Sequence, residues 1–492
     1  MVLVATLACC MAAAFFPLPA DDAYIVARYA ANIASGRGMV YNDGEAVNAL
    51  TSPFHLGVLV LLQPFASDFV TAYRALCAVV VAVVLVLFAR RAWGRSLTTA
   101  YFLALTLACP FVVFWTVGGM ETAILLCTCT AIAFLALHDE RYAAEIVALA
   151  ALAVLVRYDA VLFIGPIGGY VAWRNRNEAR VRVAFVTGAV VVIAWLGFTV
   201  MRFGDLLPTS FYVKAGRSPA IDELGRGVLY VASFVLLTWT WSAPLMGKRG
   251  NWANGALRML WIGLGLTFAY ALFASTKHMM YGYRLLVPFL PAVAVALLAS
   301  RTHPGSRAGI VLAALLVWQG TLGAFVYFYS QNPSLSLVYE GTSDANERFE
   351  FSHVGARHTA AFLATAQWQA DAIRKHWAST GTTRAPRVVV STGGALPYLL
   401  PEAYVLEHLV SFRHHCKAAL EPLADYAQVI YDADTVETVA QERGRQQREV
   451  VARFTVHADG LREKPMPLVI EIWHRAMPAP NPLPSRVREP CR

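Results

Sequence analysis

Repeated apolar runs dominate the first two thirds of this 492-residue chain. Between positions 1 and 329, runs of about 14 to 21 apolar residues alternate with short polar turns, and about 20 such residues let an α-helix cross a bilayer. Hydrophobic residues make up 57% of the sequence and charged residues 15%, against about 25% charged residues in a soluble domain. The pattern predicts a polytopic α-helical membrane protein. It excludes a disordered chain, a disulfide scaffold, a repeat solenoid and a cytosolic enzyme.

Hydropathy predicts about eleven transmembrane helices. The first run is short and lacks a positively charged n-region, so a cleaved signal peptide is an alternative interpretation of it. The predicted spans are 2–16, 69–89, 97–114, 120–138, 143–156, 159–173, 181–201, 226–247, 256–274, 285–299 and 308–329.

Basic residues gather in the turns that follow alternate spans, and the positive-inside rule assigns such turns to the cytoplasm. The N-terminus is then cytoplasmic, and every other loop faces outward together with the C-terminal part. The outward loops include 17–68, the turn around Arg157 and Asp159, 202–225 and 275–284. The basic turn residues are Arg90, Arg91, Arg95, Arg141, Arg174, Arg176, Arg180, Arg182, Lys248, Arg249, Arg258, Arg301 and Arg307.

The net charge of +9 belongs entirely to the membrane part. Before position 330 there are 23 Lys and Arg against 14 Asp and Glu, and from 330 onward there are 18 of each kind. A basic excess beside spans marks the loops that stay on the cytoplasmic side, where they contact anionic lipid headgroups. No stripe of basic and aromatic residues accompanies it, so we expect no nucleic-acid partner.

Two short helices are predicted in the first external loop, 17–68. Apolar positions between Ala20 and Ser35 suit a helix that lies in the membrane interface. The apolar run 54–66 is too short to cross comfortably, and a crossing there would place Arg90 and Arg91 outside. We expect it to form an interfacial or half-buried helix.

A small extracytoplasmic α/β domain is predicted over 330–492, after the transmembrane module 1–329. Strands are expected at 387–392, 426–431 and 467–473, helices at 355–378 and 434–446, and a Pro-rich tail at 478–492. The segment STGGALPYLLP at 391–401 resembles a glycine-rich loop but lacks GxGxxG or a Walker lysine. Cys416 and Cys491 either pair or stay free. No CxxC occurs, and we assign no metal to His414, His415 and Cys416.

Asp21 and Asp22 directly follow the first apolar run. Two adjacent carboxylates that share a site repel each other, which raises the pKa of one of them and makes it a better general base at neutral pH. The alternative is a helix N-terminal cap, a position that Asp favours. Spacing alone leaves both interpretations open.

Five stretches of the chain resemble one enzyme superfamily. Residues 21–56 look like the first external loop of the GT-C superfamily of polyprenyl-phosphate-sugar-dependent glycosyltransferases, in particular the branch of the mycobacterial terminal arabinofuranosyltransferase. The other stretches agree in order along the membrane part. They are VGGMETAILL at 117–126, LVRYDAVLF at 155–163, FGDLLPTSFYVKAG at 203–216 and YGYRLLVPFLP at 281–291.

The resemblance implies a GT-C fold and an inverting transfer of a sugar from a polyprenyl-phosphate donor to a cell-envelope glycan or lipid acceptor. It implies that Asp21 takes the proton of the acceptor hydroxyl, while Asp22 orients the acceptor or shares the proton. Lys214 and Arg284 are the candidates that stabilise the departing polyprenyl phosphate. Arg284 is alternatively a snorkelling anchor at the mouth of a span.

Further residues are expected to line the acceptor site or the cavity wall: His55, Arg157, Asp159 and Tyr212. Arg157 and Asp159 interrupt an apolar stretch, where ionisable residues are costly unless they are paired or used, although they alternatively mark a tight turn. Glu121 is interpreted as a helix-start carboxylate.

Lys277 and His278 stand where relatives often carry an acidic residue. They reverse the local charge, which argues against a metal bound by that loop, and they are candidates for contact with the donor phosphate. The resemblance still allows a divalent cation, because some members of the superfamily use one to bridge phosphate and Asp. The sugar is arabinofuranose, mannose or another hexose. The resemblance places the enzyme in the bacterial inner membrane with its active site outside. The rivals are a transporter or flippase of polyprenyl-linked sugars and a catalytically silent envelope scaffold.

Overall fold

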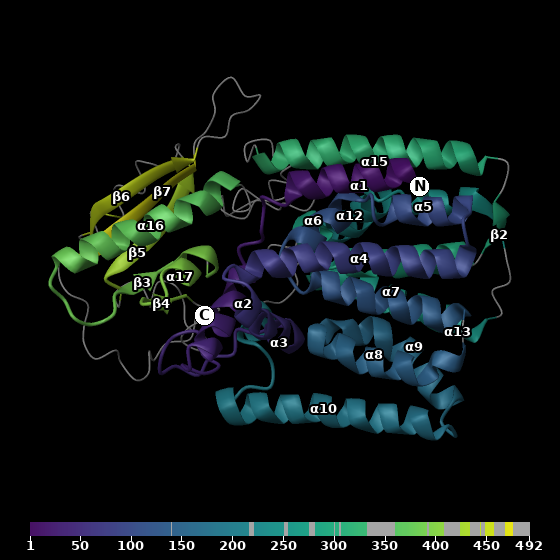
Figure 1. Cartoon of the computed structure of the whole chain (residues 1–492), viewed down its shortest axis with the longest axis horizontal. Helices are drawn as coiled ribbons and strands as arrows, with labels where there is room; N and C mark the ends of the chain where they lie inside the picture. Colours follow the sequence, from purple (N-terminus) through teal and green to yellow (C-terminus); the bar gives the residue numbers. More distant parts are fainter. Residues whose placement is uncertain are drawn as a thin grey trace.

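The structure is a computed structural model. It describes residues 1–138, 140–215, 221–249, 254–274, 281–299, 301–304, 307–331, 360–390, 393–407, 424–432, 443, 448–456 and 468–475. A bundle of helices and a separate five-stranded sheet with its own helices make up the described part (Figure 1).

Long apolar helices lie side by side and form the bundle (Figure 1). Each predicted span coincides with one helix or with two helices in succession. The bundle helices are α1 (Val2–Phe15), α4 (Phe69–Trp93), α5 (Leu97–Leu105), α6 (Pro110–Val117), α7 (Thr122–His138), α8 (Ala143–Val156), α9 (Val161–Arg174), α10 (Ala179–Phe203), α12 (Ile221–Leu237), η4 (Thr240–Met246), α13 (Gly255–Ala274), α14 (Leu290–Ala299) and α15 (Ala308–Gln331).

Length and hydropathy identify four helices of the described residues as long enough to cross a membrane, or six if each bent pair counts as one span. The first bent pair, α5 and α6, turns by 61° where Pro110 begins α6 without a backbone N–H to continue the hydrogen-bond ladder. Exposed apolar side chains such as Val183, Val186 and Ile193 cover α10. The chain is a multi-pass membrane protein, because only lipid satisfies so much exposed apolar helix surface.

Basic turns meet at one end of the bundle. The short strands β1 (Gly247–Arg249) and β2 (Arg301–Pro304) pair antiparallel and thus join two of the predicted cytoplasmic turns. The guanidinium of Arg91 lies 6.0 Å from the ring centre of Tyr142, which joins two more. These basic turns therefore lie at the same end of the bundle, whereas the side of the membrane on which they lie stays a prediction.

Two short helices, α2 (Ala23–Ala34) and α3 (Pro53–Leu62), lie at the opposite end of the bundle, beside the C-terminal sheet (Figure 1). The first falls within the range predicted for an interfacial helix, and α3 overlaps the second predicted range, 54–66. Ser52 caps α3 by accepting a hydrogen bond from the His55 amide at 3.3 Å, and Pro53 occupies the first helical position, where its missing N–H costs nothing.

The C-terminal sheet has the strand order β4-β3-β5-β7-β6. β3 pairs parallel with β4 and β5, whereas β7 pairs antiparallel with β5 and β6. Three of its strands fall on the predicted ranges, and the predicted 355–378 helix overlaps α16. Of the predicted helix 434–446 only Arg443 is described, and the tail 478–492 lies outside the described residues. The elements are β3 (Arg387–Val389), β4 (Tyr404–Leu406), β5 (Tyr426–Asp432), β6 (Arg448–Val456), β7 (Leu468–Arg475), α16 (Ala360–Ser379) and α17 (Ala395–Leu399).

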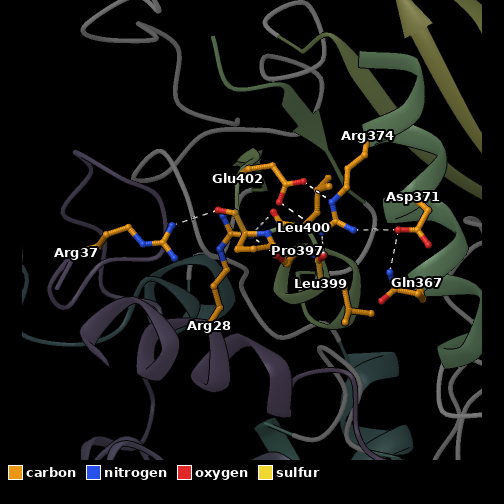
Figure 2. A network of polar contacts seen from close by, with 10 residues as sticks. Arg28, Arg37, Gln367, Asp371, Arg374, Pro397, Leu399, Leu400 and Glu402 are labelled. Atoms are coloured by element: carbon orange, nitrogen blue, oxygen red, sulfur yellow. Dashed lines mark hydrogen bonds and ion pairs between the residues drawn. The ribbon is translucent and has the colours of Figure 1, made fainter. Parts of the chain in front are cut away.

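A buried arginine of α2 fastens this sheet domain to the first loop. Arg28 is 3% exposed and donates from Nη2 to the carbonyl of Ala403 at 2.8 Å and from Nη1 to the carbonyls of Pro397 and Leu400. Figure 2 shows Arg28 reaching this segment from one side while Arg374 of α16 reaches it from the other. Asn42 adds a reciprocal pair of hydrogen bonds to the backbone of β4, at 2.8 and 2.9 Å.

We expect Arg28→Gln to loosen the docked domain. Hydrogen bonds from a charged donor contribute about 1.5–3 kcal/mol each, and their buried carbonyl partners would be left unsatisfied. Amide hydrogen exchange over 393–407 should become at least about 100-fold faster, which corresponds to about 3 kcal/mol. The matched control is Arg37→Gln, because Arg37 is exposed and reaches the same segment through one bond of 3.4 Å to Pro401. Equal exchange rates in the two variants would contradict the docking role of Arg28.

Candidate active site

Two predicted external loops meet at the end of the bundle where α2 begins. The amide of Ala20 donates to the carbonyl of Gly118 at 2.8 Å, and the hydroxyl of Tyr73 donates to the carbonyl of Met120 at 3.0 Å. Gly119 has φ +88°, and a Cβ there would lie 3.1 Å from that of Ala23. The glycines therefore let the 117–121 loop approach the start of α2 closely.

Arg284 is the centre of a charged cluster at this junction. Its Nη1 lies 2.9 Å from Oδ2 of Asp22, and its Nη2 lies 3.5 Å from Oε1 of Glu121. The guanidinium also lies 5.5 Å from the ring centre of Trp115. Glu121 is 2% exposed, so its charge requires a nearby cation. The cluster joins residues from three separate loops of the sequence.

A tight turn aims Arg284 at the two carboxylates. Trp115 Nε1 donates to the carbonyl of Gly282 at 2.8 Å. Tyr283 has φ +56°, a conformation that costs energy for a residue with a side chain. The ring of Tyr283 is fully buried and lies 5.2 Å from that of Tyr230. Aromatic packing thus holds the strained turn that precedes Arg284.

The two adjacent aspartates have different surroundings. Asp22 occupies the N-cap position of α2 but makes no side-chain capping hydrogen bond; its carboxylate contacts Arg284 instead. Asp21 is 5% exposed, and its Oδ1 accepts a hydrogen bond of 2.8 Å from the amide of Ala395 in the C-terminal domain. Asp22 is therefore used for an ion pair and not as the helix cap that was the alternative interpretation.

Gly394 lies directly against Asp21. A Cβ on Gly394 would overlap the Asp21 carbonyl oxygen and would lie 2.5 Å from the carboxylate carbon. Both atoms belong to Asp21, which is itself buried. A side chain at position 394 therefore requires the docked loop to move. The glycine-rich stretch noted in the sequence thus covers the carboxylate of Asp21.

We expect Gly394→Ala to displace the loop from Asp21, because no space exists for the added methyl group. Overpacking of this kind costs about 1–3 kcal/mol, so amide exchange of 393–400 should rise by about 5- to 150-fold. Gly57→Ala is the control, since Gly57 lies in α3 with no atom within 4 Å of an added Cβ. Unchanged protection in Gly394→Ala would show that the close approach to Asp21 does not exist.

His55 is buried beside the cluster. Neither ring nitrogen has a hydrogen-bond partner among the described residues, and the ring lies 4.6 Å from that of Tyr73. Burial lowers the pKa of His55 to about 4; the Glu121 carboxylate opposes this shift and the Arg284 charge adds to it. His55 is therefore neutral at pH 7 and offers two unused polar atoms near the cluster.

Arg157 and Asp159 pair with each other at the turn between α8 and α9. Nε of Arg157 donates to Oδ1 at 3.0 Å and Nη2 donates to Oδ2 at 2.5 Å. Nη1 of Arg157 is buried without a partner in the described part of the chain. The two charges therefore neutralise each other, and the N–H groups of the buried Nη1 are left for a further acceptor.

Of the other predicted residues, only Tyr212 has a described side chain. Tyr212 lies in α11 (Thr209–Ala215), and its hydroxyl accepts a hydrogen bond of 3.4 Å from the Leu207 amide. Thr209 in the same segment donates from its amide to the carbonyl of Asn48 at 2.7 Å, which brings the 202–225 loop to the first loop, 17–68. Lys214 belongs to α11, but its side chain, like Lys277 and His278, lies outside the described residues.

Glu121 is the residue that sequence reasoning undervalued. Its position at the start of α7 supported an interpretation as a helix-start carboxylate, yet its Oε1 faces Arg284 and its Oε2 has no hydrogen-bond partner among the described residues. The signal in the sequence was the glycine pair before it, which allows the loop to enter the site.

An apolar groove of about 370 Å³ runs along the outside of the bundle near this end. It lies between α3, α8 and α10. Its lining residues include Pro53, Phe54, Leu155, Trp195 and Phe198.

Comparison with known proteins identifies the fold. No protein-family model matches the chain, and no curated protein sequence matches it significantly. Two solved structures are similar: ArnT from Cupriavidus metallidurans in the apo state, with a TM-score of 0.58 and 14% identity, and ArnT from the same organism bound to undecaprenyl phosphate, with a TM-score of 0.54 and 15% identity. Each alignment covers 96% of this chain and 97% of ArnT. At this identity the likeness establishes the fold, and the chain has an ArnT-like GT-C fold with a small C-terminal sheet.

Proposed function

We propose that the protein is a membrane glycosyltransferase that moves a sugar from a polyprenyl-phosphate donor to a cell-envelope glycan or lipid. The observation that carries the proposal is the cluster of Asp22, Glu121 and Arg284 beside Asp21 at one end of the bundle. The fold supports it, because ArnT is a GT-C glycosyltransferase and one of its structures contains undecaprenyl phosphate.

The proposed reaction is a single displacement. The oxygen of an acceptor hydroxyl forms a bond to the anomeric carbon of the sugar, and the bond between that carbon and the phosphate oxygen breaks. The electron pair leaves with the polyprenyl phosphate, whose new negative charge is stabilised by Arg284. The proton of the acceptor passes to an aspartate, and the configuration at the anomeric carbon inverts.

Asp21 is the proposed general base, and Asp22 is the proposed positioning residue for Arg284. An arginine stabilises the charged form of a carboxylate that it contacts, which makes Asp22 a weaker base. Asp21 is buried beside Asp22, and its Oδ1 accepts a hydrogen bond from a backbone amide of the 393–395 segment. Because that segment covers Asp21, we propose that the C-terminal domain forms one wall of the acceptor site.

The apolar groove beside α3 and α10 is a proposed place for the isoprenoid chain. Its lining is almost entirely apolar and faces the outside of the bundle, so a lipid tail gains contact there without the desolvation of a polar group. Trp195 of the groove donates a hydrogen bond of 2.8 Å to Tyr158, the residue between Arg157 and Asp159. The groove thus leads toward the charged end of the bundle.

We propose four further features of the enzyme. They are the eleven spans, the division at residue 329, the extracytoplasmic position of the site, and the arabinofuranosyltransferase branch suggested by the sequence motifs. Arabinofuranose, mannose and another hexose are the candidate sugars, and Lys214, Lys277 and His278 are further candidates for contact with the donor phosphate.

The proposal is tested by donor cleavage in lipid nanodiscs. Purified protein is incubated with a panel of polyprenyl-phosphate sugars and an envelope lipid extract from the host, and mass spectrometry follows both the donor and the glycans. We expect free polyprenyl phosphate to appear together with a glycan that has gained one sugar. A flippase would leave the donor intact, and intact donor across the whole panel would contradict the proposal.

A further inference from the structure

The C-terminal domain contains a group of metal-ligating side chains that the proposed reaction does not use. Ligand atoms of His376, Glu449 and His474 all lie within 4.8 Å of one another. His376 belongs to α16, Glu449 to β6 and His474 to β7. The two strands are neighbours in the sequence and in the sheet, whereas α16 precedes them by many residues, so the fold brings His376 to the other two side chains.

The register of the sheet explains the position of two of the three residues. Glu449 on β6 stands opposite His474 on β7, and His474 in turn stands opposite Tyr426 on β5. Residues that are directly opposite on neighbouring strands project from the same face. His376 approaches this row from α16, and its ring lies 4.6 Å from the ring of His474.

The distances between the ligand atoms are close to those that zinc requires. Oε1 of Glu449 lies 3.1 Å from Nδ1 of His474 and 3.8 Å from Nε2 of His376. Ligands about 2.0–2.1 Å from a tetrahedral zinc ion are separated by about 3.3 Å. All three ligand atoms lie within 4.8 Å of one another, so the histidine side chains must move closer together to hold one ion.

A hydrogen bond orients the ring of His376 for this role. Its Nδ1 lies 2.8 Å from the hydroxyl oxygen of Tyr426. When Nδ1 donates its proton to that oxygen, the lone pair of the neutral imidazole is on Nε2, which faces Glu449. Metal-bound histidines commonly carry such a hydrogen bond on the second ring nitrogen.

We propose that His376, Glu449 and His474 bind a zinc ion that links α16 to the last two strands of the C-terminal domain. Two imidazoles and one carboxylate suit zinc. A water molecule would complete the tetrahedron, because the carboxylate side is open: the Glu449 side chain is 61% exposed, against 16% for His474. The ion would stabilise the domain that covers Asp21.

Zinc titration of the full-length protein in detergent tests the site. After chelation and dialysis, the wild type should bind one zinc ion that is sensitive to substitution of the three ligands, and its thermal unfolding temperature should rise on binding. Glu449→Gln and His474→Ala should each weaken that binding at least tenfold. Glu449→Gln is expected to fold normally because its side chain is largely exposed. Glu402→Gln is the control, since Glu402 lies in the same domain but pairs with Arg374.

X-ray absorption of the zinc-loaded wild type distinguishes this site from the cysteines of the chain. We expect only nitrogen and oxygen ligands at about 2.0–2.1 Å, whereas a sulfur ligand lies at about 2.3 Å. Three results would overturn the proposal: sulfur in the first coordination sphere, no zinc binding by the wild type at micromolar concentration, or equal affinity in the wild type and both ligand variants.

Discussion

Asp21→Asn is expected to reduce sugar transfer by about 10²- to 10⁴-fold, the usual contribution of a general base. Asparagine has nearly the same shape as aspartate, and its Oδ1 can still accept the hydrogen bond from Ala395. The variant should therefore fold, insert into the membrane and keep the C-terminal domain docked. The measurement is the initial rate of polyprenyl phosphate release in nanodiscs.

Two further variants isolate the role of Asp21. Asp43→Asn removes an exposed carboxylate from the same loop and should leave the rate unchanged. Asp22→Asn removes the negative charge that pairs with Arg284 and should lower the rate less than Asp21→Asn. Full activity in Asp21→Asn would refute the base assignment, and a larger loss in Asp22→Asn would transfer the role of the base to Asp22.

Arg284→Gln is expected to lower the turnover number by about 10²- to 10³-fold, because the departing phosphate loses a cation placed where its charge develops. The effect should fall mainly on kcat, since the interaction strengthens as the leaving bond breaks. Steady-state kinetics with varied donor concentration separates kcat from KM.

Arg284→Lys is the companion variant, because removal of the arginine charge also leaves Glu121 buried without its cation and endangers folding. Lysine keeps the charge, but its N–H groups share one nitrogen, so it cannot reach Asp22 and Glu121 through two separate nitrogens as Nη1 and Nη2 of Arg284 do. We expect partial activity in a folded protein, between those of the wild type and Arg284→Gln. A wild-type kcat in both variants would exclude Arg284 from the reaction and would favour the anchoring role that its position at a span also allows.

Hydropathy located the membrane helices because a bilayer imposes a fixed length of apolar sequence on each span. It did not predict the 61° bend between α5 and α6, since the run 97–114 reads as one apolar stretch and only Pro110 interrupts its hydrogen bonding. In the sheet domain, β4 was missed because its short apolar stretch lies between Glu402 and Glu407 and lacks the run of three valines that marks β3. β6 was missed because arginines are interspersed among its apolar positions.

The candidate site was only partly accessible to sequence reasoning. Asp21 and Asp22 were conspicuous as adjacent carboxylates after an apolar run, but no local pattern links Asp22 to Arg284, which follows 262 residues later. Glu121 matched a helix start so well that its contact with Arg284 was hidden. The cover over Asp21 was likewise unpredictable, because Gly394 belongs to another domain and contacts Asp21 only through the tertiary fold.

The role of Arg28 was also not predictable from the sequence. In the sequence it is one basic residue within an amphipathic helix, and such a residue ordinarily faces solvent or lipid headgroups. In the structure it is buried and holds three backbone carbonyls of the C-terminal domain. The domain therefore docks through backbone acceptors, which no side-chain pattern in 397–403 reveals.

The most direct test of the proposed mechanism is an experimental structure of Asp21→Asn with polyprenyl phosphate bound. The phosphate oxygens should lie within about 2.7–2.9 Å of the Arg284 guanidinium, next to Asn at position 21, with the isoprenoid chain leaving along the outside of the bundle. A phosphate bound at the opposite end, among the basic turns around Arg91 and Arg249, would contradict the assignment of this cluster as the site of sugar transfer.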